Sequence, residues 1–199
     1  MFTKAFKSVS VSGKVAMLAL FIAVSVVANS FLSIDIGTSN KVAFTYLVCF
    51  FAGCFMGPVP AFIVGVVGDA IGFLIQPVGV FWFFGVTLGL FGFLSGLIMN
   101  GIRTKTEKGL YAKAALAFAV GFIVVTCIVN SVVNYFYSYL FYWDGVFKKG
   151  FWIYVGGRLG VQSVVYAANV ILSMLLLVPM YRLPLLKGRK FSGPHERDE

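Results

Sequence analysis

Long apolar stretches separated by short polar ones dominate the sequence. Six apolar runs have the length of a helix, and they cover approximately residues 15–32, 41–56, 58–75, 81–101, 112–137 and 158–180. Runs of this length can cross a bilayer as helices, and the period-two alternation of a membrane β-barrel is missing from the sequence. The pattern therefore predicts an all-α integral membrane protein with six transmembrane helices.

The composition supports this prediction. Of the 199 residues, 60% are hydrophobic and only 12% are charged, and the mean hydropathy is +0.94. A soluble domain of this size cannot bury so much apolar surface. We predict one transmembrane domain over residues 1–181, followed by a polar, disordered tail over residues 182–199.

The basic residues predict how the chain is oriented in the membrane. The N-terminus, the 103–113 loop and the tail carry most of the 16 lysines and arginines. Because basic loops stay on the cytoplasmic side, both termini of this multi-pass membrane protein are expected there. The loops over residues 32–41, 76–80 and 138–157 then face outside.

Catalytic and metal-binding patterns are missing from the sequence. It contains no glycine-rich phosphate loop followed by lysine, and its one histidine, His195, lies in the tail. Three cysteines lie in apolar runs without metal or redox spacing: Cys49, Cys54 and Cys127. We therefore predict that the protein is not an enzyme and has no metal site or cofactor.

Small residues recur at steps of four and three in two neighbouring runs. They are Ala61, Gly65, Gly68 and Gly72 in the first run and Gly85, Gly89, Gly92 and Gly96 in the second. Each set lies on one helix face, so the two helices are expected to pack with their backbones in close contact. Asp69 lies beside the first set. A carboxylate in an apolar run needs a partner such as Arg158, or a ligand.

Polar residues in the outer half of the last two helices are candidates for solute binding. Arg158 and Gln162 are four residues apart and share one helix face. Arginine suits a carboxylate, and the glutamine amide suits the donor–acceptor edge of a heterocycle. Asn134 lies in the outer half of the preceding helix. The alternative for Arg158 and Gln162 is anchoring at the membrane interface.

Aromatic residues gather on the predicted outer side. All three tryptophans are there: Trp82, Trp143 and Trp152. Their rings could stack on a planar ligand or cover it. The alternative is an aromatic belt at the membrane surface.

Several motifs together resemble the substrate-binding S components of energy-coupling factor (ECF) transporters, and their folate group in particular. Ala19 and Ala23 form a small-xxx-small pair in the first helix. The other motifs are Gly57-Pro58, the Gly68–Leu74 stretch, Gln76-Pro77-Val78-Gly79 leading to Gly85-Val86-Thr87-Leu88, and Arg158 followed by Gln162. The resemblance spans nearly the whole chain.

The resemblance implies an S-component bundle of six helices that captures a water-soluble vitamin, most specifically folate, from outside. Its partners would be a transmembrane T subunit, which Ala19 and Ala23 would contact, and two cytoplasmic ATPase subunits. Roles expected for a folate ligand are stacking by Trp82 and Trp152, hydrogen bonding of the pterin edge by Asp69, Asn134 or Gln162, and attraction of the carboxylates by Arg158 and Lys148. The alternatives are another vitamin or precursor, such as pantothenate or pyridoxine, and a membrane scaffold protein without a solute.

Overall fold

A computed structural model describes residues 3–32, 34–36, 40–42, 44–77, 79–102, 104 and 106–181. The predicted tail over residues 182–199, including His195, lies outside the described residues. The predicted outer loops and the 103–113 loop are described in part.

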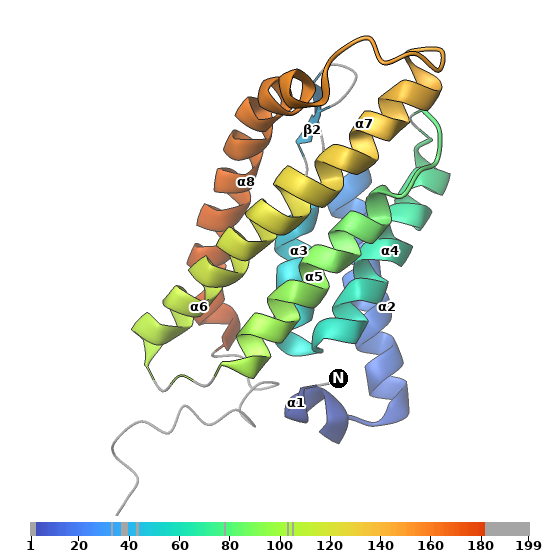
Figure 1. The fold of residues 1–199 in the computed structure, drawn as a ribbon. Helices are drawn as coiled ribbons and strands as arrows, with labels where there is room; N and C mark the ends of the chain where they lie inside the picture. The colour runs from blue at the N-terminus through green and yellow to red at the C-terminus, as the bar shows by residue number, and fades with distance from the viewer. Residues whose placement is uncertain are drawn as a thin grey trace, which may run out of the picture.

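Apolar helices form one bundle (Figure 1). In chain order the elements are α1 (Lys4–Ser8), α2 (Val11–Ser30), β1 (Ile34–Ile36), β2 (Asn40–Val42), α3 (Thr45–Phe55), α4 (Pro58–Ile75), α5 (Phe84–Gly101), α6 (Glu107–Val120), the π-helix η1 (Gly121–Val129), α7 (Asn130–Phe141) and α8 (Phe151–Tyr181). α6, η1 and α7 run on as one helix of 35 residues. α1 and the last turns of α8 lie at the same end of the bundle (Figure 1). We call this end inner and the opposite end outer, following the charge pattern.

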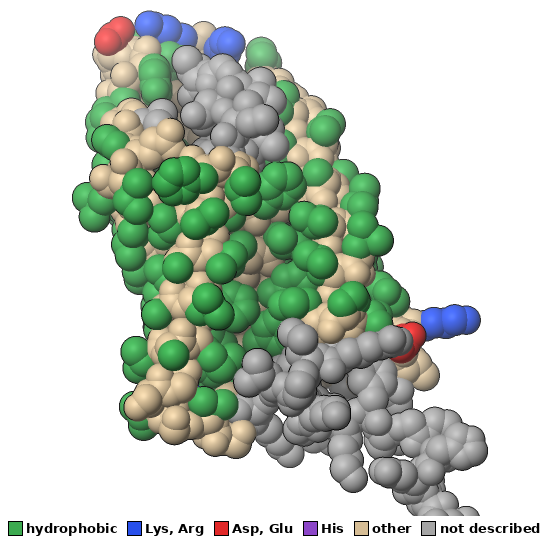
Figure 2. Space-filling view, turned by 180° about the vertical axis from the view of Figure 1, so that it is seen from behind, with side chains coloured by type: hydrophobic (Ala, Val, Ile, Leu, Met, Phe, Trp, Pro, Cys, Tyr) green, Lys and Arg blue, Asp and Glu red, His purple; other side chains and the backbone are tan. Residues whose placement is uncertain are grey.

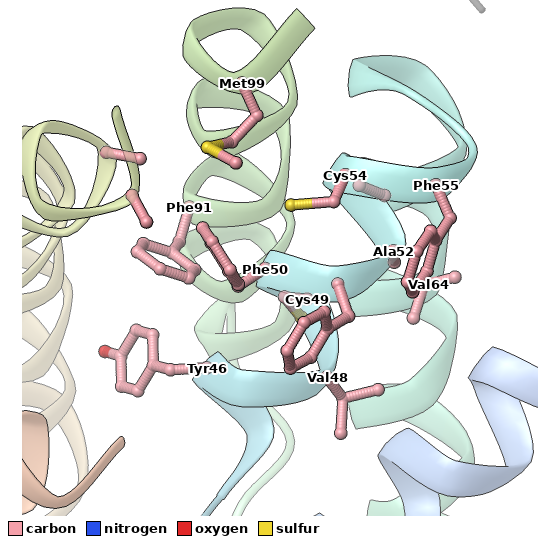
Figure 3. Packing of buried hydrophobic residues seen from close by; sticks show 14 of the residues in the cluster. Tyr46, Val48, Cys49, Phe50, Ala52, Cys54, Phe55, Val64, Phe91 and Met99 are labelled. Atoms are coloured by element: carbon pink, nitrogen blue, oxygen red, sulfur yellow. The ribbon is translucent and has the colours of Figure 1, made fainter. Parts of the chain in front are cut away.

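Within the part of the chain that the structure describes, five helices are long and apolar enough to cross a membrane. The sixth predicted span, α3, has only 11 residues. Its length of about 16 Å is half of a hydrocarbon core of ~30 Å. Nearly every α3 side chain is buried, including Cys49, Phe50 and Cys54, and Figure 3 shows these residues packed beside Phe91 and Met99 of α5. α3 is therefore the centre of the bundle.

Side chains from other elements bind the carbonyl groups at the inner end of α3. The backbone N–H of Thr3 donates to the Met56 carbonyl at 3.2 Å, and its hydroxyl donates to the Phe55 carbonyl. From α5, Asn100 Nδ2 donates to the Gly53 carbonyl at 2.9 Å. Helix ends inside a membrane lack water as a partner, so these bonds allow a short helix to end there.

The predicted close packing of α4 and α5 is confirmed. A Cβ atom on Gly65 would collide with the backbone of Leu88 and Gly89, and one on Gly92 would lie 3.0 Å from the Ala61 carbonyl oxygen. Gly96 approaches the turn before α4 in the same way, since its Cβ would lie 2.8 Å from Pro58 Cα. These small residues thus bring two backbones into direct contact. Gly68 and Gly72 of the predicted α4 set face α2 instead, since a Cβ on Gly72 would lie 3.1 Å from Asn29 Nδ2.

Two predicted loops contain regular structure. In the 32–41 loop, β1 and β2 pair antiparallel with Ile34 opposite Val42. In the 138–157 loop, α7 continues to Phe141 and α8 already begins at Phe151. Glycines at positions 150, 156 and 157 interrupt the helical sequence pattern there, but tertiary contacts of this segment keep it helical.

Replacing Gly65 with alanine tests the backbone contact. Gly65→Ala forces α4 away from α5 and is expected to destabilise the protein by roughly 1–3 kcal/mol, which thermal unfolding in detergent measures. Gly156→Ala is the matched control, because a Cβ there meets nothing within 4 Å. This control is expected to leave the melting temperature unchanged or raise it. Equal melting temperatures for Gly65→Ala and the wild type would contradict the packing.

Candidate functional site

Buried polar side chains line the contact between α7 and α8 in the outer half of the bundle. We call this set the polar seam; it consists of Asn130, Asn134, Ser138, Tyr154, Arg158 and Gln162, all of them buried. The members are spaced by four along each helix, so each helix contributes one face. The structure therefore brings together Asn134, Arg158 and Gln162, three of the predicted ligand-binding residues.

Hydrogen bonds connect the two sides of the polar seam. Arg158 Nη1 donates to the Asn130 carbonyl at 3.1 Å. Asn134 Nδ2 donates to the carbonyl and to the side-chain oxygen of Asn130, at 2.9 and 2.8 Å. The Tyr154 hydroxyl donates to the Asn134 carbonyl at 3.3 Å and lies 3.2 Å from Ser138 Oγ. These bonds hold the outer turns of α8 against α7 and explain why this segment is helical.

Arg158 lies deeper than the sequence predicts. The expected place was the outer rim, at the start of the last helix. Because α8 begins at Phe151, Arg158 follows about two turns later, about 10 Å along the axis, and only 6% of its surface is exposed. A buried guanidinium presents a fixed set of hydrogen-bond donors in a medium of low dielectric constant, where each bond is stronger than in water.

The π-helix η1 ends directly before Asn130. Ser131 Oγ donates to the Thr126 carbonyl five residues back, at 3.0 Å, and Gly121 lies against the Phe91 ring and the Tyr166 hydroxyl. A π-helix has a wider turn than an α-helix, so η1 changes which side chains of α7 face the bundle. π segments often occur at functional sites, and here the segment sets the direction of the Asn130 and Asn134 side chains.

Tyr46 is a residue of the site that sequence reasoning missed. It begins the buried face of α3, and its hydroxyl faces the side chains of Thr126 and Asn130 within electrostatic reach of Arg158. Its ring packs edge-on against Phe91, with the ring centroids 5.1 Å apart. No local sequence signal predicts this position, because its partners are 80 to 112 residues away along the chain.

The predicted tryptophans lie in different surroundings. Trp82 Nε1 donates to the Val133 carbonyl of α7 at 3.1 Å, and its ring contacts Tyr137 and Phe141. Trp82 thus lies at the outer end beside the helix that carries half of the polar seam. Trp152 is 80% exposed and contacts the ring of Phe151, so the structure does not bring it together with Trp82.

Basic side chains gather at the outer rim. Lys148 forms an exposed ion pair of 3.4 Å with Asp144, and Lys149 is also exposed. Figure 2 shows basic groups at the end of the molecule that carries the α7–α8 connection, above sides covered by hydrophobic residues. Asp144 offsets the charge of Lys148, and Lys149 adds a positive charge at the end where the polar seam lies.

Asp69 contacts residues of α2 and α5. Its Oδ1 accepts a hydrogen bond of 3.0 Å from Asn29 Nδ2 of α2, and its side chain lies against Gly85 of α5. Ser30 of α2 also donates to the Gly72 carbonyl at 3.3 Å. We infer that Asp69 ties α2 to α4; its predicted role in ligand binding stays a prediction.

Ala19 and Ala23 are exposed on α2. The apolar side chains of Val15, Leu20 and Val24 are exposed on the same helix. α2 thus presents a long outward surface with small residues at its middle. This placement suits the predicted contact with a T subunit, which stays a prediction.

Removing the Asp69 carboxylate tests its structural role. Asp69→Ala loses the hydrogen bond with Asn29 and is expected to destabilise the protein by about 1.5–3 kcal/mol. Asp69→Asn keeps an oxygen that can accept a hydrogen bond from Asn29, so its stability should lie between that of Asp69→Ala and that of the wild type. Thermal unfolding and hydrogen exchange in α2 measure both variants. An Asp69→Ala variant as stable and as protected as the wild type would contradict this role.

Comparisons with known proteins agree with this architecture. The chain resembles a solved structure described as "Crystal structure of FolT bound with folic acid", with a TM-score of 0.66 and 24% sequence identity over 84% of this chain and 95% of that chain. This likeness shows that the fold is that of FolT. The sequence model of the family "ECF-type riboflavin transporter, S component" matches residues 10–182. The chain therefore belongs to the family of ECF-type riboflavin transporter S components, the substrate-binding membrane subunits of these transporters.

Proposed function

We propose that this S component captures folate from outside the cell in a bacterial plasma membrane. The observation that carries the proposal is the buried polar seam between α7 and α8, in a chain that belongs to a vitamin-transporter family. A membrane protein keeps polar side chains inside its bundle where they serve a ligand or hold helices together. A membrane scaffold protein without a solute would not need so long a polar face next to a basic rim.

The depth of Arg158 favours one orientation of the ligand. Placing both folate carboxylates beside a single buried guanidinium would require the removal of two charges from water. The uncharged pterin edge carries oxo, amino and ring-nitrogen groups, which match the donors and acceptors of Asn134, Arg158 and Gln162. We therefore place the pterin in the polar seam and the glutamate tail at the outer rim near Lys148.

Aromatic stacking on the ligand is assigned to Trp82. Its hydrogen bond to Val133 fixes the indole beside α7, and its ring is half-buried among other rings. A fixed indole can stack on a planar ring with little loss of side-chain entropy. Trp152 is left out of the pocket because its ring is directed away from the bundle.

Riboflavin is the second candidate, because the family description names it. Its flat isoalloxazine ring has a similar hydrogen-bonding edge and would suit the same seam. Its sugar-alcohol tail is uncharged, however, so it gains nothing from Lys148 and Lys149 at the outer rim. The basic rim therefore favours folate.

Titrating the purified protein separates these ligands. We expect calorimetry and tryptophan fluorescence to detect folate binding and a weaker response to riboflavin, pantothenate and pyridoxine. Removing both rim charges in a Lys148→Ala, Lys149→Ala variant should weaken folate roughly two- to fivefold in low salt and leave riboflavin unchanged. Lys108→Ala, an exposed charge at the inner end, is the control. Binding of another vitamin, with folate inactive, would reject the folate assignment.

The energy for uptake must come from partner subunits, because the sequence contains no nucleotide-binding loop. We propose that a T subunit docks on the exposed α2 surface around Ala19 and Ala23, and that two cytoplasmic ATPases complete the importer. Small residues let another helix approach closely. In this arrangement the chain binds its solute without transforming it.

Enlarging the two alanines tests the docking surface. An Ala19→Leu, Ala23→Leu variant should lose most of its co-purification with the T subunit, since the added side chains hold the partner helix away. Ligand affinity should stay within about twofold, because α2 does not contribute to the polar seam. Ala167→Leu, at an exposed position on α8, is the control. Unchanged co-purification in the double variant would place the interface elsewhere.

A further inference from the structure

Thr126 has a buried hydroxyl below the polar seam that faces the hydroxyl of Tyr46. The residue is only 1% exposed, and its Oγ1 makes no hydrogen bond to the residues that the structure describes. Most buried polar side-chain atoms in proteins have a partner. Four other described hydroxyls also lack one, those of Ser25, Thr45, Ser95 and Ser173, so it is the place of Thr126 beside the polar seam that makes it a candidate for ligand binding. Its position in η1, one turn before Asn130, places it next to the proposed pterin site.

Tyr46 and Thr126 face each other from different elements. The Tyr46 hydroxyl of α3 is directed toward Thr126 and Asn130, and the positive charge of Arg158 is close enough to act on it. Three elements that are distant in the sequence thus converge: α3, the η1–α7 junction and α8. Convergent polar groups from several elements are typical of ligand sites.

An aromatic layer bounds these groups on the inner side. The Tyr46 ring lies 5.1 Å from Phe91 and 5.4 Å from Tyr166, measured between ring centroids. The Tyr166 hydroxyl donates to the Phe118 carbonyl at 2.8 Å, so this hydroxyl stabilises the contact between α8 and α6. Tyr46 and Thr126 therefore lie between the polar seam and this aromatic layer.

We propose that Thr126 and Tyr46 are specificity-determining residues that hydrogen-bond the leading edge of a flat, oxo- and amino-substituted heterocycle. This inference rests on the proposed function and assigns the inner end of its ligand site. A threonine hydroxyl can donate to an oxo group or a ring nitrogen and can accept from an amino group. A site built from such groups rejects rings that lack them, because its own polar atoms then stay unpaired.

Two variants test the proposal, and two others serve as controls. Thr126→Val removes the hydroxyl with almost no change in volume, and Tyr46→Phe removes the other hydroxyl and keeps the ring contacts. Each should weaken folate binding by about tenfold or more, since an unpaired group is left on the ligand. Tyr166→Phe is the matched control in the same aromatic layer, and Ser173→Ala removes another buried hydroxyl without a partner. Both controls should stay within about twofold of the wild-type affinity.

The measurements are calorimetric affinities for folate and riboflavin, with thermal unfolding of each variant. Thr126→Ser restores a hydroxyl and should recover the affinity, which keeps the test valid if Thr126→Val folds poorly. If the wild type binds folate and both Thr126→Val and Tyr46→Phe bind equally well, this inference is wrong and the proposed function stands. If the wild type binds none of the vitamins, both the proposed function and this inference are wrong. If Tyr166→Phe also loses affinity for folate, the loss in the other variants reflects disturbed packing of the aromatic layer, and the inference is wrong.

Discussion

The fold depends on the direct backbone contact between α4 and α5. Lipid tails are as apolar as the helix surfaces, so burial of apolar area alone does not hold helices together in a membrane. Gly65 and Gly89 let α4 and α5 approach closely, and the van der Waals contacts between their backbones hold the two helices together. The joined pair presents one surface to α3, which is too short to cross a membrane and depends on its neighbours at both ends.

The two ends of the bundle use polar groups differently. At the inner end, Thr3, Asn100 and Lys113 bind carbonyl groups of α3 and α5; the ammonium group of Lys113 donates to the Met99 and Ile102 carbonyls at 3.1 and 2.6 Å. These bonds close helix ends that water cannot reach. In the outer half, polar side chains converge between helices instead. This asymmetry is the physical reason for proposing a ligand site in the outer half.

The proposed ligand site and the proposed partner surface lie in different parts of the molecule. The polar seam and Tyr46 lie inside, among α3, α7 and α8, whereas Ala19 and Ala23 are exposed on α2. Asp69 of α4 accepts a hydrogen bond from Asn29 of α2 and so connects the helix that carries Ala19 and Ala23 to the rest of the bundle. Substitutions in one region are therefore expected to act independently of the other, as distant sites usually do.

The sequence by itself determined the helices, the glycine-faced pair, the family resemblance and three members of the seam, because hydrophobic runs and residue spacing are local properties of a chain. It placed Asn134, Arg158 and Gln162 correctly on helix faces that meet. Only the tertiary structure decided that Arg158 is deep, that Asp69 contacts Asn29, that Trp152 is directed outward and that Tyr46 joins the site. Those outcomes depend on contacts between residues far apart in sequence. They also depend on the π segment and the glycine-rich turns of α8, where tertiary packing determines the backbone conformation against the local preference of the sequence.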